Sequence, residues 1–296
     1  MTVIRGIWTA AAAMTLFLIT ACANGTPTGA SGSSSAGPSS APAAPAGDGL
    51  VLRVTRAGGF VPADVMLGRL PVVSVYADGR IITEGPQIAI YPAPALPNLQ
   101  VQQVSPETVD ALVKQALDAG VRSGDAFGKP GMADAPTTVV TVVTGGTTYS
   151  VSVVGLGEAS PDDPRLSDAE KKARAKLSEF IGKLTGLPGA KGLPEPQPYR
   201  ADAVAALAGP YQTPAASELP SPPPAITWPG PELPGDTLPS GRPCVAATGA
   251  QADAVLAAAK DAKATTPWVS GGEKYQVTLR PLLPDETGCG DLAGTR

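Results

Sequence analysis

The amino-acid sequence predicts an α+β fold: antiparallel sheets of hairpins with helices packed on one face, plus a small disulfide-closed C-terminal α+β subdomain. A Gly-Gly pair at 145–146 separates two runs rich in Val, Thr and Ser, as in a β-hairpin. The segments 105–120 and 167–186 carry apolar residues at the spacing of an amphipathic helix. Cys244 and Cys289 enclose a short C-terminal region with helix and strand patterns.

Residues 1–21 have the composition of a signal peptide. Arg5 supplies a positive charge, and the apolar stretch of about 13 residues that follows is shorter than the roughly 20 needed to span a bilayer. Small residues then precede Cys22, and the segment resembles a bacterial lipoprotein signal, whose lipobox ends in the acylated cysteine. The resemblance implies a mature chain that begins at Cys22 with a diacylglyceryl and palmitate anchor on the extracytoplasmic, outer face of the cell membrane. The alternative is an ordinary secretory signal in which Cys22 carries no lipid.

Residues 22–47 consist mostly of Gly, Ser, Ala and Pro without an apolar period. Such a segment cannot bury enough apolar surface to offset the entropy lost on ordering, so we expect a disordered, lipid-anchored tether. A flexible chain of this length has a mean reach of roughly 25–30 Å. The tether would hold the folded part away from the membrane surface.

The region 48–208 is expected to form the larger α+β domain, which opens with a strand at 50–55. A hairpin follows at 71–83, and short edge segments are expected at 87–91 and 99–104.

The hairpin within 71–83 is expected to turn at Asp78-Gly79, because this dipeptide lies between two β-branched runs. A two-residue turn at this position would place Tyr76 opposite Ile81.

Two helices and a second hairpin complete this region. Ser105 followed by proline is a good helix start, and 167–170 reads as a capping box that opens the second helix. In the hairpin 137–154, a two-residue loop pairs 142 with 149, 140 with 151 and 138 with 153, which gives one apolar face and one face that tolerates water. Residues 199–207 fit either a strand or a short helix, and we favour a strand.

Residues 209–243 contain eleven prolines and are predicted to be a proline-rich linker, from which 226–228 can dock into a core. The last region, 244–296, is predicted to be the small α+β subdomain, with a helix that a capping box at 248–251 opens. With Cys22 assigned to lipid, Cys244 and Cys289 remain as an even pair in an oxidising compartment, and we expect them to form a disulfide.

The composition excludes several kinds of chemistry. The chain has no histidine, which removes Ser-His-Asp and Cys-His catalysis and zinc sites with histidine ligands. Its net charge of −4, without a basic block, argues against a nucleic-acid partner. No nucleophile or cofactor motif is present in the sequence, so we expect no catalytic residues, cofactor or metal.

Two kinds of residue leave alternatives open. The acidic clusters at 162–163 and 285–291 lack the spacing of a calcium loop, although a pair of carboxylates close in space could still serve a hydrolase. Five aromatic residues could line a ligand surface, but core packing explains each of them better; they are Tyr76, Tyr91, Trp228, Trp268 and Tyr275.

The lipobox, the tether and two further segments, 73–80 (VSVYADGR) and 280–286 (RPLLPDE), resemble uncharacterised actinobacterial lipoproteins. The resemblance implies a location and an architecture, and no catalytic residues. We therefore expect a membrane-anchored extracytoplasmic lipoprotein that acts as a non-catalytic binding or structural component of the cell envelope, with an envelope protein or a glycan as its partner. The alternatives are a solute-binding lipoprotein of a transporter and a carboxylate-dependent hydrolase.

Overall fold

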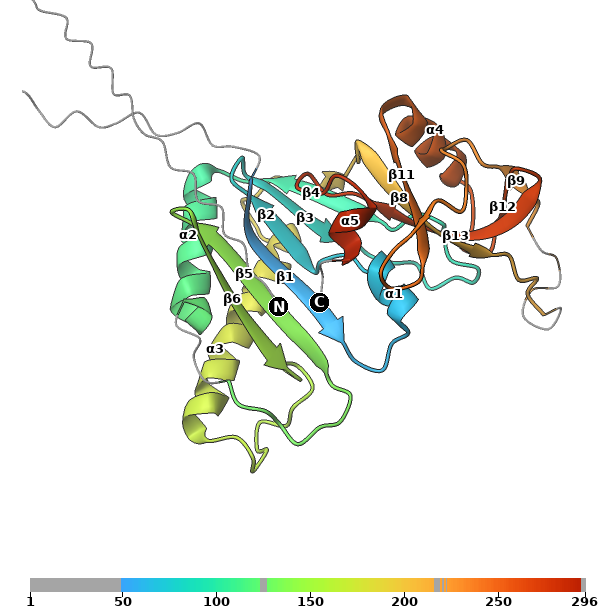
Figure 1. The fold of residues 1–296 in the computed structure, drawn as a ribbon. Coiled ribbons are helices and arrows are strands. Elements are labelled where there is room, and N and C mark those ends of the chain that lie inside the picture. The colour runs from blue at the N-terminus through green and yellow to red at the C-terminus, as the bar shows by residue number, and fades with distance from the viewer. Residues whose placement is uncertain (1–48, 123–126, 216–218, 220, 222, 294–296) are drawn as a thin grey trace, which may run out of the picture. The chain divides into compact units, whose positions relative to one another are not determined.

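Seven strands form a first, antiparallel sheet in the order β6-β5-β1-β2-β3-β4-β7 (Figure 1). The computed structural model describes residues 49–122, 127–215, 219, 221 and 223–293, so the predicted signal peptide, Cys22 and the tether lie outside the described residues. The strands are β1 (Leu50–Gly58), β2 (Val73–Tyr76), β3 (Arg80–Glu84), β4 (Leu99–Gln103), β5 (Pro136–Thr144), β6 (Thr147–Val154) and β7 (Gln197–Pro198).

Helices cover one face of this sheet. Helix α2 (Pro106–Ala116) runs on into a π-helical turn (Leu117–Val121), and α3 (Asp168–Thr185) packs beside it. Both starts were predicted correctly: the side chain of Ser105 caps α2, and Ser167 and Glu170 form the expected capping box. A short helix, α1 (Ala63–Gly68), follows β1, and a 3-10 turn (Leu187–Gly189) follows α3.

The core beneath these helices consists of the inward-facing residues of the sheet and the apolar stripes of α2 and α3. Its strand residues include Leu52, Val54, Val73, Val75, Ile81, Val140, Val142, Val151 and Val153, all nearly inaccessible to solvent. The register predicted for the second hairpin is confirmed, since Val142 pairs with Tyr149 and Val140 with Val151 across the Gly145-Gly146 turn. Both turn glycines have positive φ, as a two-residue hairpin loop requires.

The register predicted for the first hairpin is wrong by one residue. Ile81 pairs with Val75 and therefore shares a face with Val75, whereas Tyr76, the last residue of β2, lies on the opposite face. Gly79 has φ +91° and donates its N–H to the carbonyl of Tyr76, which makes a turn one residue longer than Asp78-Gly79 suggests.

The segment expected as a short strand at 87–91 is irregular, because the prolines on either side of it cannot donate to a sheet.

The second sheet has six strands in the order β10-β11-β8-β13-β12-β9, antiparallel except for the β9–β12 pair. The strands are β8 (Ala203–Pro210), β9 (Ile226–Thr227), β10 (Asp236–Thr237), β11 (Pro243–Thr248), β12 (Pro267–Ser270) and β13 (Glu273–Pro281). Helix α4 (Gly249–Ala259) packs on this sheet, and the short α5 (Cys289–Ala293) ends the described chain. Thr248 precedes α4, but its side chain makes no capping hydrogen bond, so the predicted capping box is absent.

Strand β8 lies at the centre of the second sheet, between β11 and β13, although the sequence analysis placed residues up to 208 with the first region. Residues 204–209 are buried on both faces, and a continuous apolar run of this kind carries no alternation from which to assign it to a sheet. The segment 209–243 likewise contributes β9, β10 and Trp228, which stacks edge-on against Trp268 with the ring centres 5.4 Å apart. Both sheets belong to one compact unit that spans 44–296.

The predicted disulfide is present. Cys244 in β11 and Cys289 at the start of α5 are bonded; their Cα atoms are 6.0 Å apart, and the residues are 45 positions apart in the chain. The bond ties the end of the chain to the second sheet.

Replacing both cysteines, as Cys244→Ala with Cys289→Ala, should lower the free energy of unfolding by about 4 kcal/mol, because the bond restricts the unfolded chain. We expect the melting temperature to fall by roughly 10 °C, measured by differential scanning calorimetry. A reductant should lower the melting temperature of the wild type and leave that of the double variant unchanged. An equal effect of reductant on both proteins would contradict this account.

Candidate functional site

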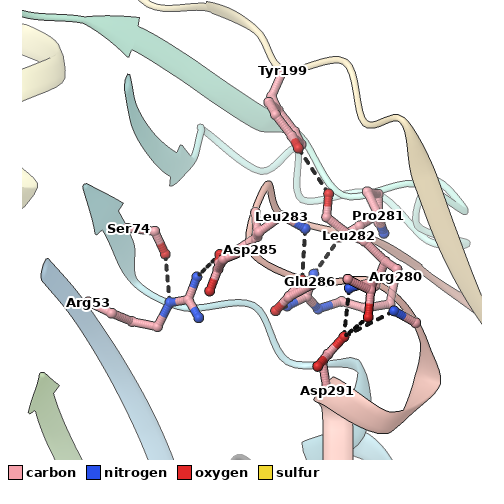
Figure 2. Close-up of polar contacts among 12 residues, drawn as sticks. Arg53, Ser74, Tyr199, Arg280, Pro281, Leu282, Leu283, Asp285, Glu286 and Asp291 are labelled. Atoms are coloured by element: carbon pink, nitrogen blue, oxygen red, sulfur yellow. Dashed lines mark hydrogen bonds and ion pairs between the residues drawn. The ribbon is translucent and has the colours of Figure 1, made fainter. Parts of the chain in front are cut away.

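The segment 280–291, which we call the C-terminal clamp, leaves the end of β13 and folds back on itself (Figure 2). Arg280 and Glu286 form an ion pair with 2.8 Å between Nη2 and Oε1, and their side chains are only 2% and 6% exposed. The second oxygen of Glu286 accepts a hydrogen bond from the N–H of Leu283 at 2.7 Å, and Arg280 donates to the carbonyl of Pro281. A buried charge without a partner costs several kcal/mol, so these contacts hold the turn in one conformation.

Asp291 closes the second half of the clamp. Its Oδ2 accepts hydrogen bonds from the N–H of Thr287 at 2.6 Å and the N–H of Gly288 at 3.0 Å. These bonds shape the turn that leads into Cys289 and its disulfide with Cys244.

Asp285 reaches from the clamp to the face of the first sheet opposite α2 and α3 (Figure 2). Its Oδ1 lies 2.7 Å from Nη2 of Arg53 and 2.7 Å from the hydroxyl of Tyr76, which donates to it. Arg53 also donates from Nε to Oγ of Ser74 at 3.0 Å. Because side chains alternate between the faces of a strand, these groups lie on the face opposite the helix-covered core. The clamp thus joins the end of the second sheet to β1 and β2.

An apolar contact accompanies this polar one. Leu283 is buried in a cluster that includes Tyr76, Ile82 and Leu99. The hydroxyl of Tyr199 donates a hydrogen bond to the carbonyl of Leu282 at 2.9 Å. The second face of the first sheet is therefore covered over β2 and β3, whereas the Thr and Ser side chains on this face of β6 are exposed to solvent, as predicted.

Burial and mutual contact set the charges in the clamp contact. Burial disfavours charged Arg53, but the hydrogen bond and charge of Asp285 outweigh it and raise the pKa of the guanidinium. Burial also opposes ionisation of Asp285, but the hydrogen bonds from Arg53 and Tyr76 outweigh it and lower the pKa of this carboxyl group. Burial first, and then the hydrogen bond to Asp285, raise the pKa of Tyr76. At neutral pH a cation and a neutral hydroxyl therefore both donate to one carboxylate.

The acidic clusters noted in the sequence consist of carboxylates with separate partners. Asp285 pairs with Arg53, Glu286 with Arg280, and Asp163 accepts hydrogen bonds from backbone N–H groups, which lower the pKa of its carboxyl group. A glycosidase acid needs a raised pKa, whereas the pKa values of Asp285 and Asp163 are lowered, so these two carboxylates have the character of structural groups. Within the described ranges, no three His, Cys, Asp or Glu side chains lie close enough together to hold a metal ion.

Six large apolar side chains are exposed among the described residues, and all of them lie on connections that leave the same end of the first sheet; two of these connections also contact the second sheet, through 93–95 and through Leu67 of α1. The six are Phe60, Val65, Ile88, Ile90, Tyr91 and Met132, with exposed fractions of 94%, 52%, 62%, 48%, 66% and 39%.

We call these six residues the apolar rim. The pairing of the strands shows why their connections leave the same end of the sheet. Gly58 at the end of β1 lies opposite Pro136 at the start of β5, and β3 runs parallel to β1, so that Glu84 ends β3 at this end too. Strand β1 begins at Leu50, at the other end of the sheet, and its nine residues span about 30 Å. The rim therefore lies far from the point where the predicted tether joins the fold.

A hollow of about 610 Å³ opens beside Phe60 within the rim. Arg56 and Arg69 line it together with Glu84 and Asp134, so it presents charges of both signs next to an exposed aromatic ring. Its volume lies within the roughly 300–1,000 Å³ of small-molecule sites.

The aromatic residues singled out in the sequence divide between these environments. Trp228, Trp268 and Tyr76 are buried, in agreement with the prediction of core packing, and Tyr275 is partly buried against the core of the second sheet. Tyr91 is exposed and belongs to the apolar rim.

Arg53, the partner of Asp285, and the exposed residues Phe60 and Ile88 are not among the candidate residues that the sequence pattern indicates. Arg53 and Asp285 are 232 positions apart, and nothing in either local pattern connects them. The exposure of Phe60 and Ile88 could have been predicted from the sequence, since each is a large apolar residue in a Gly- or Pro-rich connection, where core residues are uncommon.

Comparison with known proteins adds no family to these observations: no protein-family model matches the chain, and no curated protein matches it. In the part of the chain that the structure describes, no helix has the length and apolar character needed to cross a membrane.

The variant Asp285→Asn should lower the free energy of unfolding by about 2 kcal/mol at pH 7, because it removes the charge that Arg53 and Tyr76 contact. The pKa of Asp285 is lower in the folded state than in the unfolded state, so its contribution is present above about pH 4 and is lost as the pH falls through the folded value. Urea unfolding at pH 7 and pH 3 should show the wild type and the variant converging in stability at the lower pH.

The matched control is Asp110→Asn, which changes an exposed carboxylate on α2 and should alter stability by less than about 0.5 kcal/mol. A loss of stability in Asp285→Asn that is the same at pH 3 and pH 7 would show that the carboxylate charge is not the stabilising feature.

Proposed function

We propose that the protein is a membrane-anchored, extracytoplasmic binding component of the cell envelope, held by a lipid on Cys22 and acting through the apolar rim. The observation that carries this proposal is the position of the rim: every large apolar side chain exposed among the described residues lies on a connection that leaves the same end of the first sheet. Soluble proteins rarely expose such groups together unless they contact a partner.

The composition of the rim favours a protein as the partner. Aliphatic side chains such as Ile88 and Ile90 bind apolar protein surface, and Phe60 and Tyr91 are of the type that forms the centres of protein interfaces. The arginines of the adjacent hollow are also enriched in such interfaces. A glycan partner would use the aromatic rings and leave the aliphatic side chains exposed.

The position of the rim along the chain supports the same role. The predicted tether enters β1 at the end of the sheet away from the rim, so a partner can approach the rim without displacing the anchor. A tether with a reach of roughly 25–30 Å lets the rim meet partners at a range of heights above the membrane.

A second candidate is a solute-binding lipoprotein, and the hollow of about 610 Å³ beside Phe60 is the observation in its favour. The sheets, however, are almost wholly antiparallel, and they lack the repeated parallel βα units from which the two lobes of a transporter-associated binding protein are built. The hollow is also lined by residues at the end of one sheet, whereas a solute-binding protein of this kind holds its ligand between two lobes.

Cross-linking in intact cells tests the proposal, with the full-length protein as bait and mass spectrometry of the captured proteins. The rim variant Phe60→Ser, Ile88→Ser, Tyr91→Ser should reduce capture of the dominant partner at least about fivefold, because it removes the side chains expected at the centre of the interface. The measurement is the amount of partner recovered per amount of bait.

The matched control replaces three exposed residues of α2, Asp110→Ser, Ala111→Ser and Gln115→Ser, which lie away from the rim. We expect the control to capture the partner as the wild type does. Equal recovery by the rim variant would refute a role for the rim, and recovery of a transporter permease alone would favour the solute-binding candidate.

A further inference from the structure

The outer strand β6 leaves a long, open edge on the first sheet. It has eight residues, and among the described strands its only neighbour is β5 (Figure 1). The other three sheet edges end in β7, β9 and β10, which have two residues each. Short edge strands are one of the means by which proteins prevent pairing with other chains, and β6 departs from that pattern.

The backbone of β6 is available for pairing at three positions. The Gly145-Gly146 turn makes residues 147, 149, 151 and 153 the hydrogen-bonded partners of β5, so the N–H and C=O groups of Thr148, Ser150 and Ser152 point away from it. Their side chains are exposed, and no described residue outside β5 forms a hydrogen bond with their backbone groups. At the end of the strand, Arg174 donates to the carbonyl of Val154 and closes the edge there.

The sequence of β6 also lacks the usual protection. The whole hairpin 136–154 contains no charged residue, and its only proline is residue 136, on β5. The pairing of β5 with β6 has no bulge that would bend the edge away. Charged residues, prolines and bulges are the devices that normally block an exposed edge.

We propose that β6 is an interface at which a second copy of this chain adds antiparallel to the first sheet, about a two-fold axis through Ser150. This register pairs residue 150 with itself, 148 with 152 and 149 with 151, and it uses all three outward-facing positions in about six backbone hydrogen bonds. The strand matches itself in this arrangement: Tyr149 lies opposite Val151 on one face, and Thr148 lies opposite Ser152 on the other.

Two features favour a second copy over an unrelated strand. A charged residue near the two-fold axis would face its own copy, and β6 carries none. Pairing through β6 also stops at two copies. The opposite edge of the first sheet is β7, which has only two residues, and its second residue is a proline that cannot donate a hydrogen bond to a further strand. The assembly is therefore a closed dimer with one continuous sheet.

The test measures the mass of the full-length protein in detergent by native mass spectrometry, over a range of protein concentrations. We expect a dimer for the wild type. Ser150→Lys and Ser150→Glu should each raise the dissociation constant of the dimer at least about tenfold, because each places like charges opposite one another at the axis. An equimolar mixture of the two variants should form a heterodimer, since Lys then faces Glu.

The control is Gln276→Lys, which places the same charge at an exposed position of β13, a strand that is paired on both sides in the second sheet. It should leave the dimer unchanged, because this position takes no part in the β6 edge. Ser150→Pro provides a second variant that removes the outward N–H and leaves the bonds to β5 intact; it should also give a monomer.

The melting temperature of each variant shows whether it is folded. A wild-type protein that stays monomeric at every concentration would overturn the proposal. A dimer that both Ser150→Lys and Ser150→Pro leave intact would do the same, as would a different polypeptide bound at β6.

Discussion

The buried ion pair between Arg280 and Glu286 shapes the clamp, which is one of the contacts that join the two sheets; backbone hydrogen bonds between residues 93–95 and 262–264 form another. The ion pair holds the turn that carries Leu283 and Asp285, and these residues reach Tyr76 and Arg53 on the first sheet. Burying two charges is costly, and replacement of such a pair by apolar residues is often neutral for stability. The pair therefore fixes the direction of the clamp, and the burial of Leu283 adds an apolar contact with the first sheet.

Local signals in the sequence predicted the elements whose structure is set locally. The Gly145-Gly146 hairpin has the expected register because alternation on both strands and the two-residue turn agree. Ser167 and Glu170 form their capping box because both partners lie within one helical turn. The first hairpin differs because Gly79 alone takes the positive φ, so the turn is longer and Ile81 pairs with Val75. The alternation along β2 places Tyr76 on the face away from the helices, where it contacts Asp285.

Features that join distant parts of the chain could be predicted only where chemistry restricts the partners. The disulfide was predictable because two cysteines remained once Cys22 was assigned to lipid. Asp285 had no such restriction, since any cation in the chain could have been its partner. The place of β8 was hidden for a different reason: its small apolar residues are buried on both faces, and such a run fits the centre of any sheet.

The central position of β8 has a consequence for the order in which the chain can fold during synthesis. Both neighbours of β8, β11 and β13, follow it in the chain, and β13 ends only at Pro281. Strands β1 to β6 can pair as soon as residue 154 has emerged, whereas β8 stays without one neighbour until almost the whole chain is made. A protease that cuts after β11 therefore leaves a first sheet joined to an apolar strand with an open edge, because β8 then lacks β13.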